Sequence, residues 1–414
     1  MKFTLDQLKG KAYICSNGCQ ESRLDAAKVE RFLQLNGWKI VDEMSQADLI
    51  VFYVCGLTAV AEKESIAIIK EFKRKMKPGA QLIPWGCLSK INPELLNQVY
   101  DGPFFGEKEA SLFFDKITNT QISFEDVDAY SLSSVHLKFL AVLKRYKRLI
   151  LSNPLLVALD IFYYYLSTIA APDTDQSFFY IKASTGCPGN CTYCAVRMSR
   201  GITRSRPIEK IVVDFQHGIE KGFKLFYLLG TDLGAYGQDL GYNLSDLLKE
   251  MVKEKGDYKI GIRNLNPYYL KQMLTDLCET FKSGKIFHIT CPVESGSNKI
   301  LGLMGRKYTT EELKECIEKI KRVFPEMLFR TQIMVGFPME TNDDFYESVR
   351  LVDEIPFDFV EVYKFSKRPG TQAASMDEQI PDDIAEKRFR KLQLKVAYKA
   401  TMRKINRIAK IRGL

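Results

Sequence analysis

The chain of 414 residues has only three histidines, and its start has no apolar stretch of the kind that a secretory signal needs. The opening segment, MKFTLDQLKGKAY, mixes charged and apolar residues instead. We therefore expect a cytoplasmic protein. In that reducing compartment the ten cysteines are expected to bind metal or to react, and not to pair as disulfides. The histidines show no pattern that assigns them a role.

Long apolar runs, internal repeats and low-complexity segments are also missing. The longest apolar run, 155–171, is about one residue short of a membrane-spanning helix and contains Asp160, so no transmembrane segment is expected. Acidic residues are absent from Lys387 to the end, where eleven Lys or Arg occur. With a net charge of +9, this tail permits a polyanionic partner but does not require one. An apolar fraction of 46% is enough for large folded cores.

The first third of the chain alternates strand and helix patterns. The run ADLIVFYVC is apolar throughout, which is typical of a parallel strand buried on both faces. The order predicts a small doubly wound parallel sheet over about 9–118. The expected strands cover 11–14, 38–41, 47–55 and 81–87, and the expected helices cover 24–35 and 59–75.

From Phe178 onward, six strand candidates separated by helical stretches predict a parallel barrel or partial barrel of six βα units. The candidates are FFYIKAS, KLFYLLG, YKIGIRN, KIFHITC, LFRTQIMVG and FDFVEVYKF. A basic helix is expected over about 381–412.

We therefore expect an α/β protein in four parts. These are the doubly wound N-terminal domain (1–118), a helical apolar and basic linker or insertion (119–174), the partial barrel (175–380) and the basic C-terminal helix (381–414). The insertion is expected to form two helices split at Asn153-Pro154 and packed on the domain interface. The alternative is an amphipathic element that lies on a membrane surface or grips a substrate.

Three cysteines lie within eight residues in the stretch STGCPGNCTYCAVRMSRG, and no fourth follows. A structural zinc site needs four ligands, and a c-type haem site needs a His where Ala195 stands. A cubane iron–sulfur cluster held by Cys187, Cys191 and Cys194 leaves one iron open for a substrate, which accounts for three ligands. The loop follows the first barrel strand, at the face where such barrels place their chemistry. A chance grouping of buried cysteines is the alternative.

Three further cysteines, Cys19, Cys55 and Cys87, follow strands of the first sheet. Ligands of open α/β sheets bind beyond the carboxyl ends of the strands, so these dispersed cysteines can meet at one point. This second three-thiol hypothesis competes with ordinary buried cysteines. Cys15, Cys278 and Cys316 are assigned to packing.

The C-x3-C-x2-C motif with Tyr193 before its last cysteine resembles the signature of radical S-adenosylmethionine enzymes. The resemblance implies that Cys187, Cys191 and Cys194 hold a [4Fe–4S] cluster whose open iron chelates S-adenosylmethionine. One-electron cleavage would then give a 5′-deoxyadenosyl radical that abstracts hydrogen from an unactivated C–H bond.

Almost the whole chain, about 11–400 apart from 119–174, resembles the radical S-adenosylmethionine methylthiotransferases. The matching stretches are GCQ, the strand ends VC and GC, SRGITRSRP, LLGTDLGAYGQDLG, PVESGS, MVGFPMET and RPGTQAA. The resemblance implies that Cys19, Cys55 and Cys87 hold an auxiliary [4Fe–4S] cluster that carries the sulfur, with S-adenosylmethionine as both radical source and methyl donor. The stretches LLGTDLGAYGQDLGYNL and NLNPYYL most resemble the branch that methylthiolates threonylcarbamoyl-adenosine in tRNA.

The sequence departs from the family pattern in three places. Glu294 stands where the family usually has Gln, and Thr290 and Cys291 stand where it tends to have His and an aliphatic residue. The sequence also ends at Leu414, where the family continues into an RNA-binding β-barrel called TRAM, so we expect that domain to be absent.

Because phosphate contacts would then be few, the expected substrate is a peptide or protein side chain. The alternative is adenosine 37 of tRNA, with the basic tail in place of the missing domain. An iron–sulfur electron-transfer or carrier protein is a remote alternative, since it would not need the barrel motifs. We expect a monomer that receives electrons from a donor such as flavodoxin or ferredoxin.

The resemblance also suggests residues that bind the cofactor. Gly230, Thr231 and Asp232 would contact the amino group of S-adenosylmethionine, unless they only form a turn. Tyr193 is a further candidate, and so are Glu294, Ser295 and Arg330, for which turn or core roles are the alternative. The last is Gly336, whose missing side chain would permit close approach beneath the adenine. Arg200, Arg204 and Arg206 either pair an anion or cap the next helix.

Overall fold

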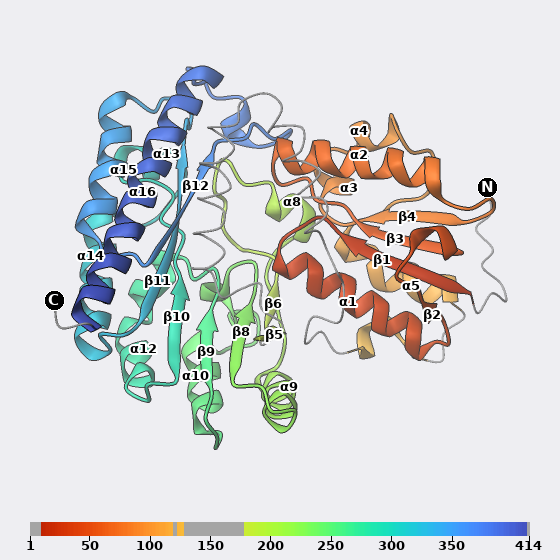
Figure 1. Cartoon of the computed structure of the whole chain (residues 1–414), viewed down its shortest axis with the longest axis horizontal. Coiled ribbons are helices and arrows are strands. Elements are labelled where there is room, and N and C mark those ends of the chain that lie inside the picture. The colour runs from red at the N-terminus through yellow and green to blue at the C-terminus, as the bar shows by residue number, and fades with distance from the viewer. Residues whose placement is uncertain (1–9, 119–121, 128–177, 412–414) are drawn as a thin grey trace.

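Two parallel β-sheets lie side by side in the computed structural model, which describes residues 10–118, 122–127 and 178–411 (Figure 1). The first sheet has four strands in the order β2-β1-β3-β4, and the second has six in the order β12-β11-β10-β9-β8-β5. Both are parallel throughout, which confirms the predicted α/β class.

The first sheet carries helices on both faces because its strands are apolar on both sides. Its central strand β3 (Leu49–Tyr53) is fully buried: Leu49, Val51 and Tyr53 face one core, and Ile50 and Phe52 face the other. The elements are β1 (Lys11–Ser16), α1 (Gln20–Leu35), β2 (Lys39–Ile40), α2 (Ala59–Lys75), β4 (Gln81–Trp85), α3 (Leu88–Ile91), α4 (Pro93–Asn97) and α5 (Ala110–Thr118).

Helices α1 and α5 pack on one face of this sheet, and α2, α3 and α4 pack on the other. Pro84 lies in β4, where it pairs with Phe52. A proline has no N–H for the ladder and is tolerated there because β4 is the edge strand. The predicted doubly wound sheet is thus present.

The second sheet forms the predicted partial barrel, with β5 and β12 as its edges. Its outward side chains, such as Phe179, Phe226 and Ile260, join the large core under the surrounding helices. Its strands are β5 (Phe178–Lys182), β8 (Leu225–Leu229), β9 (Lys259–Ile262), β10 (Ile286–Thr290), β11 (Leu328–Val335) and β12 (Phe359–Lys364). Its helices are α9 (Ile208–Glu220), α10 (Leu244–Lys253), α11 (Pro267–Gln272), α12 (Leu274–Phe281), α13 (Asn298–Leu303), α14 (Thr310–Val323) and α15 (Asn342–Glu354).

The inner face of the partial barrel meets the N-terminal domain. Tyr180 of β5 and Tyr227 of β8 stack with ring centroids 5.9 Å apart, and Leu24 of α1 packs in the same buried cluster. Helix α1 therefore joins two cores: one side of it covers the first sheet, and Leu24 reaches the second. This shared helix brings the carboxyl ends of the two sheets together.

The final helix α16 (Asp382–Ile411) lies close to its expected bounds and packs Leu392 and Val396 into the barrel core. Of the expected insertion, the structure describes only a short turn, Phe124–Asp126, whose Phe124 ring packs 5.3 Å from that of Phe32. The two helices predicted within 119–174 lie outside the described residues. In the part of the chain that the structure describes, no helix is long and apolar enough to cross a membrane.

Candidate functional site

The loop that carries Cys187, Cys191 and Cys194 lies between the short strand β6 (Ser184–Thr185) and helix α8 (Val196–Arg200). Its backbone is held at both ends, since Cys187 N donates to Gly201 O at 3.0 Å and Thr192 N donates to Met304 O at 3.0 Å. Gly186 has φ +83°, and a Cβ there would lie 2.1 Å from Ile202 O. The tight start of the loop therefore requires glycine.

The three thiols of this loop fit a cluster that binds each sulfur to a different iron. Gly189 N donates to Cys187 Sγ at 3.3 Å, and a Cβ on Gly189 would lie 3.2 Å from that sulfur and 4.0 Å from Cys191 Sγ. Among the described residues, no three His, Cys, Asp or Glu side chains converge closely enough to hold a single metal ion. A cubane cluster bonds its three protein ligands to three different irons, so its thiols need not converge on one metal ion.

Burial and nearby acidic groups favour the protonated thiol at Cys187 and at Cys194 when no metal is bound. Burial raises the pKa of Cys187 to about 11, with Asp232 and Cys191 adding to it. Burial likewise raises the pKa of Cys194 to about 12, and Cys191 and Cys187 contribute. Metal binding to such thiols releases their protons.

Arg306 is the buried cation beside this loop. Its Nη1 lies 3.6 Å from Cys191 Sγ, and its Nη2 donates to Pro292 O at 2.7 Å. Glu294 Oε1 lies 4.0 Å from Arg306 Nη2, and Glu294 also forms a hydrogen bond with Tyr193. The Tyr193 ring packs edge-on against Phe337 at 6.5 Å. Glu294 thus lies beside Tyr193, a residue of the cysteine loop, and the cofactor-binding roles of both stay predictions.

Asp232 lies on the other side of the loop, 3.9 Å from Cys187 Sγ. Its carboxylate accepts Gly234 N at 3.0 Å and Asn266 Nδ2 at 3.4 Å. Burial raises its pKa, and Arg306 opposes that shift. Asp232 therefore both caps the short turn Leu233–Ala235 and faces the cysteine loop, so the turn and cofactor hypotheses are compatible.

The cysteines of the second trio lie where topology places them, beyond the carboxyl ends of neighbouring strands. Cys19 precedes α1, Cys55 follows β3 and Cys87 follows β4. Asn17 ties two of these turns together, because its Oδ1 accepts Cys55 N at 2.9 Å and its Nδ2 donates to Ser65 Oγ at 2.9 Å.

Both other thiols of this trio influence the Cys55 thiol. Burial raises the pKa of Cys55 to about 12, and Cys87 and Cys19 both add to that rise. Cys55 and Cys87 are buried, whereas Cys19 is exposed. Cys19 is therefore the solvent-exposed member of the second trio, and Cys87 lies in the core.

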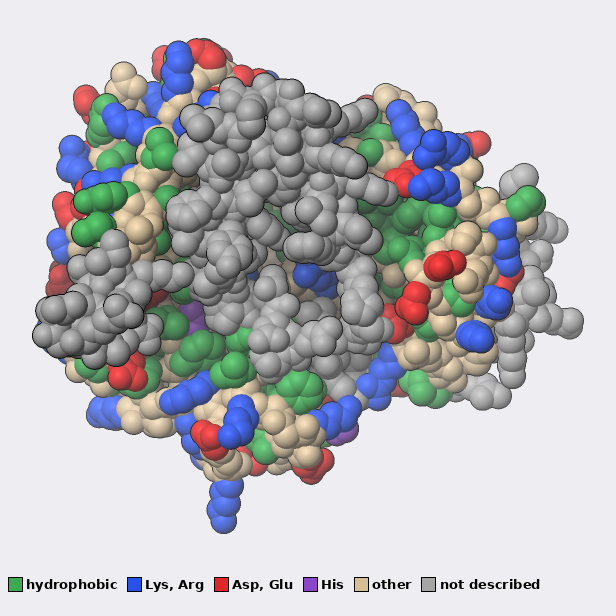
Figure 2. Space-filling view, in the orientation of Figure 1, with side chains coloured by type: hydrophobic (Ala, Val, Ile, Leu, Met, Phe, Trp, Pro, Cys, Tyr) green, Lys and Arg blue, Asp and Glu red, His purple; other side chains and the backbone are tan. Residues whose placement is uncertain are grey.

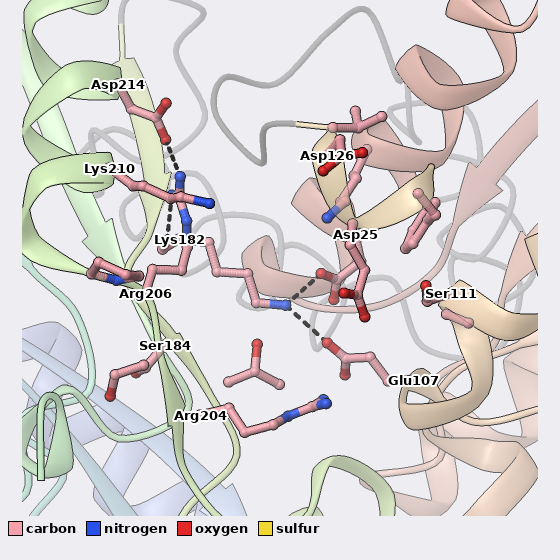
Figure 3. A pocket seen from close by; sticks show the side chains of 18 of the residues that line it. Asp25, Glu107, Ser111, Asp126, Lys182, Ser184, Arg204, Arg206, Lys210 and Asp214 are labelled. Carbon is pink, nitrogen blue, oxygen red and sulfur yellow. Dashed lines mark hydrogen bonds and ion pairs between the residues drawn. The ribbon is translucent and has the colours of Figure 1, made fainter. Parts of the chain in front are cut away.

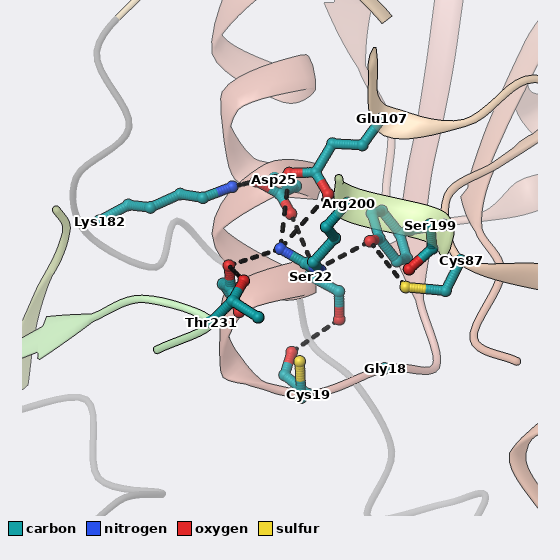
Figure 4. Close-up of polar contacts among 12 residues, drawn as sticks. Gly18, Cys19, Ser22, Asp25, Cys87, Glu107, Lys182, Ser199, Arg200 and Thr231 are labelled. Atoms are coloured by element: carbon teal, nitrogen blue, oxygen red, sulfur yellow. Dashed lines mark hydrogen bonds and ion pairs between the residues drawn. The ribbon is translucent and has the colours of Figure 1, made fainter. Parts of the chain in front are cut away.

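A buried polar network links the loop of the first trio to Cys87 of the second. Figure 4 shows its members Thr231, Arg200 and Cys87. Gly186 N donates to Thr231 Oγ1 at 3.1 Å, and Thr231 donates to Glu21 Oε1 at 2.9 Å. Arg200 reaches the same Glu21 oxygen at 2.6 Å and donates to Tyr53 Oη at 2.9 Å. Tyr53 Oη lies 3.4 Å from Cys87 Sγ.

Two more acids and a lysine complete this network. Lys182 Nζ contacts Asp25 at 2.5 Å and Glu107 at 2.8 Å, and Arg200 contacts both acids as well. Burial raises the pKa of Glu107, but Arg200 and Lys182 lower it more, to about 2. Burial and Glu107 raise the pKa of Asp25 to about 6 against the same two cations. Arg200 and Lys182 therefore favour the ionised form of both acids.

The remaining predicted residues have structural partners. Gly230 follows β8 and has no room for a side chain, since a Cβ would lie 2.7 Å from Ser184 Oγ. Ser295 Oγ accepts Ser297 N at 3.1 Å, and Arg330 pairs with Glu361. Gly336 has φ +76°, and a Cβ there would lie 2.7 Å from the Cβ of Ala385 in α16.

The sequence left two roles possible for Arg200, Arg204 and Arg206, namely pairing with an anion or capping a helix. Two of these arginines pair with carboxylates. Arg200 joins the network described above, and Arg206 contacts Asp214 of α9 at 2.7 Å. Arg204 lies in the short strand β7 (Arg204–Ser205). The pairing hypothesis therefore holds for Arg200 and Arg206.

A cavity of about 740 Å³ opens between the two sheets, next to the network (Figure 3). Both sheets contribute to its wall, for example Asp25 and Lys28 from α1 and Lys182 from β5. Six basic and six acidic residues line it, so it shows no preference for a polyanion. None of the six cysteines is among its described lining residues.

The sequence did not reveal Arg306, Tyr53, Glu21 or Asn17. Each forms hydrogen bonds with residues far away in the sequence, and none belongs to a motif of fixed residue spacing. The only sequence signal was position: Asn17 and Glu21 flank Cys19, and Tyr53 lies two residues before Cys55.

Comparisons with known proteins agree with this architecture. Residues 181–352 match the family model of the Radical SAM superfamily, and residues 11–103 match the Uncharacterized protein family UPF0004. The chain resembles the structure of the radical S-adenosylmethionine methyltransferase TsrM from Kitasatospora setae, with a TM-score of 0.57 and 12% identity over 88% of this chain and 77% of that one. That likeness concerns the fold alone.

Curated relatives match nearly the full length. A probable threonylcarbamoyladenosine tRNA methylthiotransferase from Pyrococcus horikoshii is 30% identical over 97% of this chain and 88% of its own. A tRNA-2-methylthio-N(6)-dimethylallyladenosine synthase from Thermodesulfovibrio yellowstonii is 31% identical (97% and 86%). A ribosomal protein uS12 methylthiotransferase from the same organism is 30% identical (92% and 81%). The chain therefore belongs to the radical S-adenosylmethionine methylthiotransferase family.

Proposed function

We propose that this enzyme inserts a methylthio group into an adenosine of tRNA of the threonylcarbamoyl-adenosine type. The observation that carries the proposal is the full-length similarity to a probable tRNA methylthiotransferase, in a chain whose two cysteine trios meet across one hydrogen-bonded network. A tRNA substrate agrees with the cytoplasmic location that the sequence predicts.

Each trio has a separate role in the proposal. Cys187, Cys191 and Cys194 hold the [4Fe–4S] cluster that binds S-adenosylmethionine, and Cys19, Cys55 and Cys87 hold the auxiliary cluster. When bound, these groups supply a hydrogen-abstracting radical and a sulfur donor. Two clusters and S-adenosylmethionine are the cofactors that the family uses.

The chain itself positions and shields these groups. Arg306 offers a buried positive charge beside Cys191, and Glu294 and Tyr193 lie next to it. Tyr193, which lies within the loop, packs its ring edge-on against Phe337 and so helps to hold the loop in place. The Thr231–Glu21–Arg200 contacts fix the loop of Cys187 relative to helix α1, which begins just after Cys19.

The names of the relatives favour tRNA over the peptide substrate that the sequence suggested. Two of the three relatives act on tRNA according to their names, and the third acts on a ribosomal protein. A protein side chain stays the second candidate because of that third relative.

The charge distribution does not decide between the two substrates. On the face shown in Figure 2, Lys and Arg are spread over both halves and interspersed with Asp and Glu, outside the residues drawn in grey. Phosphate contacts would thus be distributed over the surface, and binding would weaken as salt rises.

Expression in bacteria that lack their own threonylcarbamoyl-adenosine methylthiotransferase tests the substrate. Nucleosides from total tRNA would be analysed by mass spectrometry, with a Cys19→Ala variant as the inactive control. We expect the methylthio form of threonylcarbamoyl-adenosine with the native protein only. Unchanged tRNA together with a methylthio group on a ribosomal protein would contradict the proposal and favour the second candidate.

A further inference from the structure

The hydroxyl of Tyr53 lies between a cation and a proposed cluster ligand. Its Oη is 2.9 Å from Arg200 Nη2 and 3.4 Å from Cys87 Sγ. All three side chains are buried, with 1% of Tyr53, 2% of Arg200 and 3% of Cys87 exposed. Hydrogen bonds at such a site are electrostatically stronger than in water.

The direction of the hydrogen bond to Cys87 follows from the donors present. A guanidinium group has donors and no acceptor, so the Tyr53 oxygen accepts from Arg200. A cysteine that binds iron is a thiolate and can only accept. The single proton of Tyr53 is therefore the one available to the Cys87 sulfur.

A second hydroxyl near Cys87, that of Ser199, already donates its proton elsewhere. Ser199 lies within hydrogen-bond reach of Cys87, but it donates its proton to Val196 O at 2.9 Å. Of the two hydroxyls that contact Cys87 in the described part of the chain, Tyr53 is thus the one whose proton can reach the sulfur.

Packing fixes the Tyr53 ring in this position. The ring meets Trp85 edge-on at 4.9 Å, and Gly86 adopts φ +109° directly beside it. A Cβ on Gly86 would lie 2.7 Å from the ring, so only glycine before Cys87 leaves room for Tyr53. The donor is held in place before any cluster binds, as a tuning residue would need to be.

We propose that Tyr53, positioned by Arg200, donates a hydrogen bond to Cys87 Sγ and thereby raises the reduction potential of the cluster that Cys87 helps to hold. The inference rests on the proposed function, which makes Cys87 a ligand. Reduction adds negative charge to a cluster, and a donor at a ligand sulfur stabilises the more negative state. Tyr53 is a positioning residue, because it acts through Cys87 and touches no substrate.

The test is a potentiometric titration followed by electron paramagnetic resonance. The parent is the full chain with Cys187, Cys191 and Cys194 changed to Ala, so that only the auxiliary cluster gives a signal. Tyr53→Phe should retain about four irons per chain and shift the midpoint potential to more negative values. Arg200→Lys, which weakens the orientation of Tyr53 but keeps its hydroxyl, should shift it less in the same direction.

Tyr100→Phe is the matched control. Tyr100 is a buried tyrosine of the same domain whose hydroxyl donates to Leu82 O, away from the six cysteines. It should destabilise the fold without moving the potential, since no sulfur loses a donor.

Three results would count against the inference. Equal potentials for Tyr53→Phe and Tyr100→Phe would overturn it while leaving the cluster assignment intact. If Tyr53→Phe loses its iron, an unchanged potential in Arg200→Lys would overturn it as well. A parent that binds no iron would instead overturn the proposed ligand role of Cys87, and the inference with it.

Discussion

Glycines decide the shape of the cysteine loop at the scale of single residues. Gly186 adopts a left-handed conformation against Ile202 O, and Gly189 leaves space between the sulfurs of Cys187 and Cys191. Neither position tolerates a methyl group easily, because the atoms that it would meet are backbone atoms or cysteine sulfurs. The residues that bind no metal are therefore as necessary to this site as those expected to bind it.

Changing Gly189 to Ala tests this view. The new Cβ would lie 3.2 Å from Cys187 Sγ and displace the sulfur by a few tenths of an ångström. We expect lower iron content after reconstitution, falling from about eight toward about four per chain, with an unchanged melting temperature.

Gly302→Ala is the control for that experiment, since nothing lies within 4 Å of its Cβ position in α13. It should keep all its iron and gain about 0.5–1 kcal/mol in stability. Full iron content in Gly189→Ala would mean that the sulfurs do not converge on a cluster there.

Spacing motifs were predictable at this scale, and long-range partners were not. The C-x3-C-x2-C pattern puts three thiols in one loop whatever surrounds it. Arg306 meets Cys191 across 115 residues, and Arg200 meets Glu21 across 179, so no local pattern announces either contact. Gly336 illustrates a further limit. The sequence predicted that another group approaches this glycine closely, but it did not predict that Ala385 of α16 does so.

At the scale of secondary structure, apolar runs identified all six barrel strands and the four strands of the first sheet. The strand ends were less accurate, because several runs continue past the last ladder pair. For example, the run ADLIVFYVC extends to Cys55, whereas β3 ends at Tyr53, where the chain turns to place Cys55 at the sheet edge. These overhangs carry Cys55 and Cys87, two of the proposed cluster ligands.

The final helix offers a test at this scale. Arg388 of α16 contacts Glu340 Oε2 at 2.7 Å, and the Glu340 side chain is fully buried. Arg388→Ala should lower the free energy of unfolding by about 3–5 kcal/mol, because it leaves a buried carboxylate without its cation. Chemical denaturation would measure the change.

Arg390 of the same helix provides the comparison. It is exposed and pairs with Glu386 one turn away, so Arg390→Ala should cost at most about 0.5 kcal/mol. Equal losses for the two variants would show that the buried pair does not anchor α16.

At the scale of the whole molecule, the main feature is the group of buried ion pairs between the two domains. Arg200 from the barrel contacts Glu21, Asp25 and Glu107 from the N-terminal domain, and Ala195 beside Cys194 packs into that domain's core. The two domains therefore share a core, which the sequence order alone did not indicate. The distance between the trios depends on this interface.

Arg200→Met tests whether the domains unfold as one unit. Three buried acids would be left with Lys182 as their main cation, so stability should fall by about 3–5 kcal/mol. We expect the N-terminal domain to melt first, seen as two transitions by calorimetry. A single transition at the native temperature would contradict a joining role for Arg200.

Comparing the two cysteine trios in one assay tests the central claim most directly. Reconstituted proteins would be incubated with reductant, S-adenosylmethionine and tRNA, and both 5′-deoxyadenosine and methylthio-adenosine would be measured. With Cys19, Cys55 and Cys87 changed to Ala, we predict continued 5′-deoxyadenosine formation and no methylthio product. With Cys187, Cys191 and Cys194 changed to Ala, we predict neither. Methylthio product from the first variant, or 5′-deoxyadenosine from the second, would contradict the division of labour between the two sites.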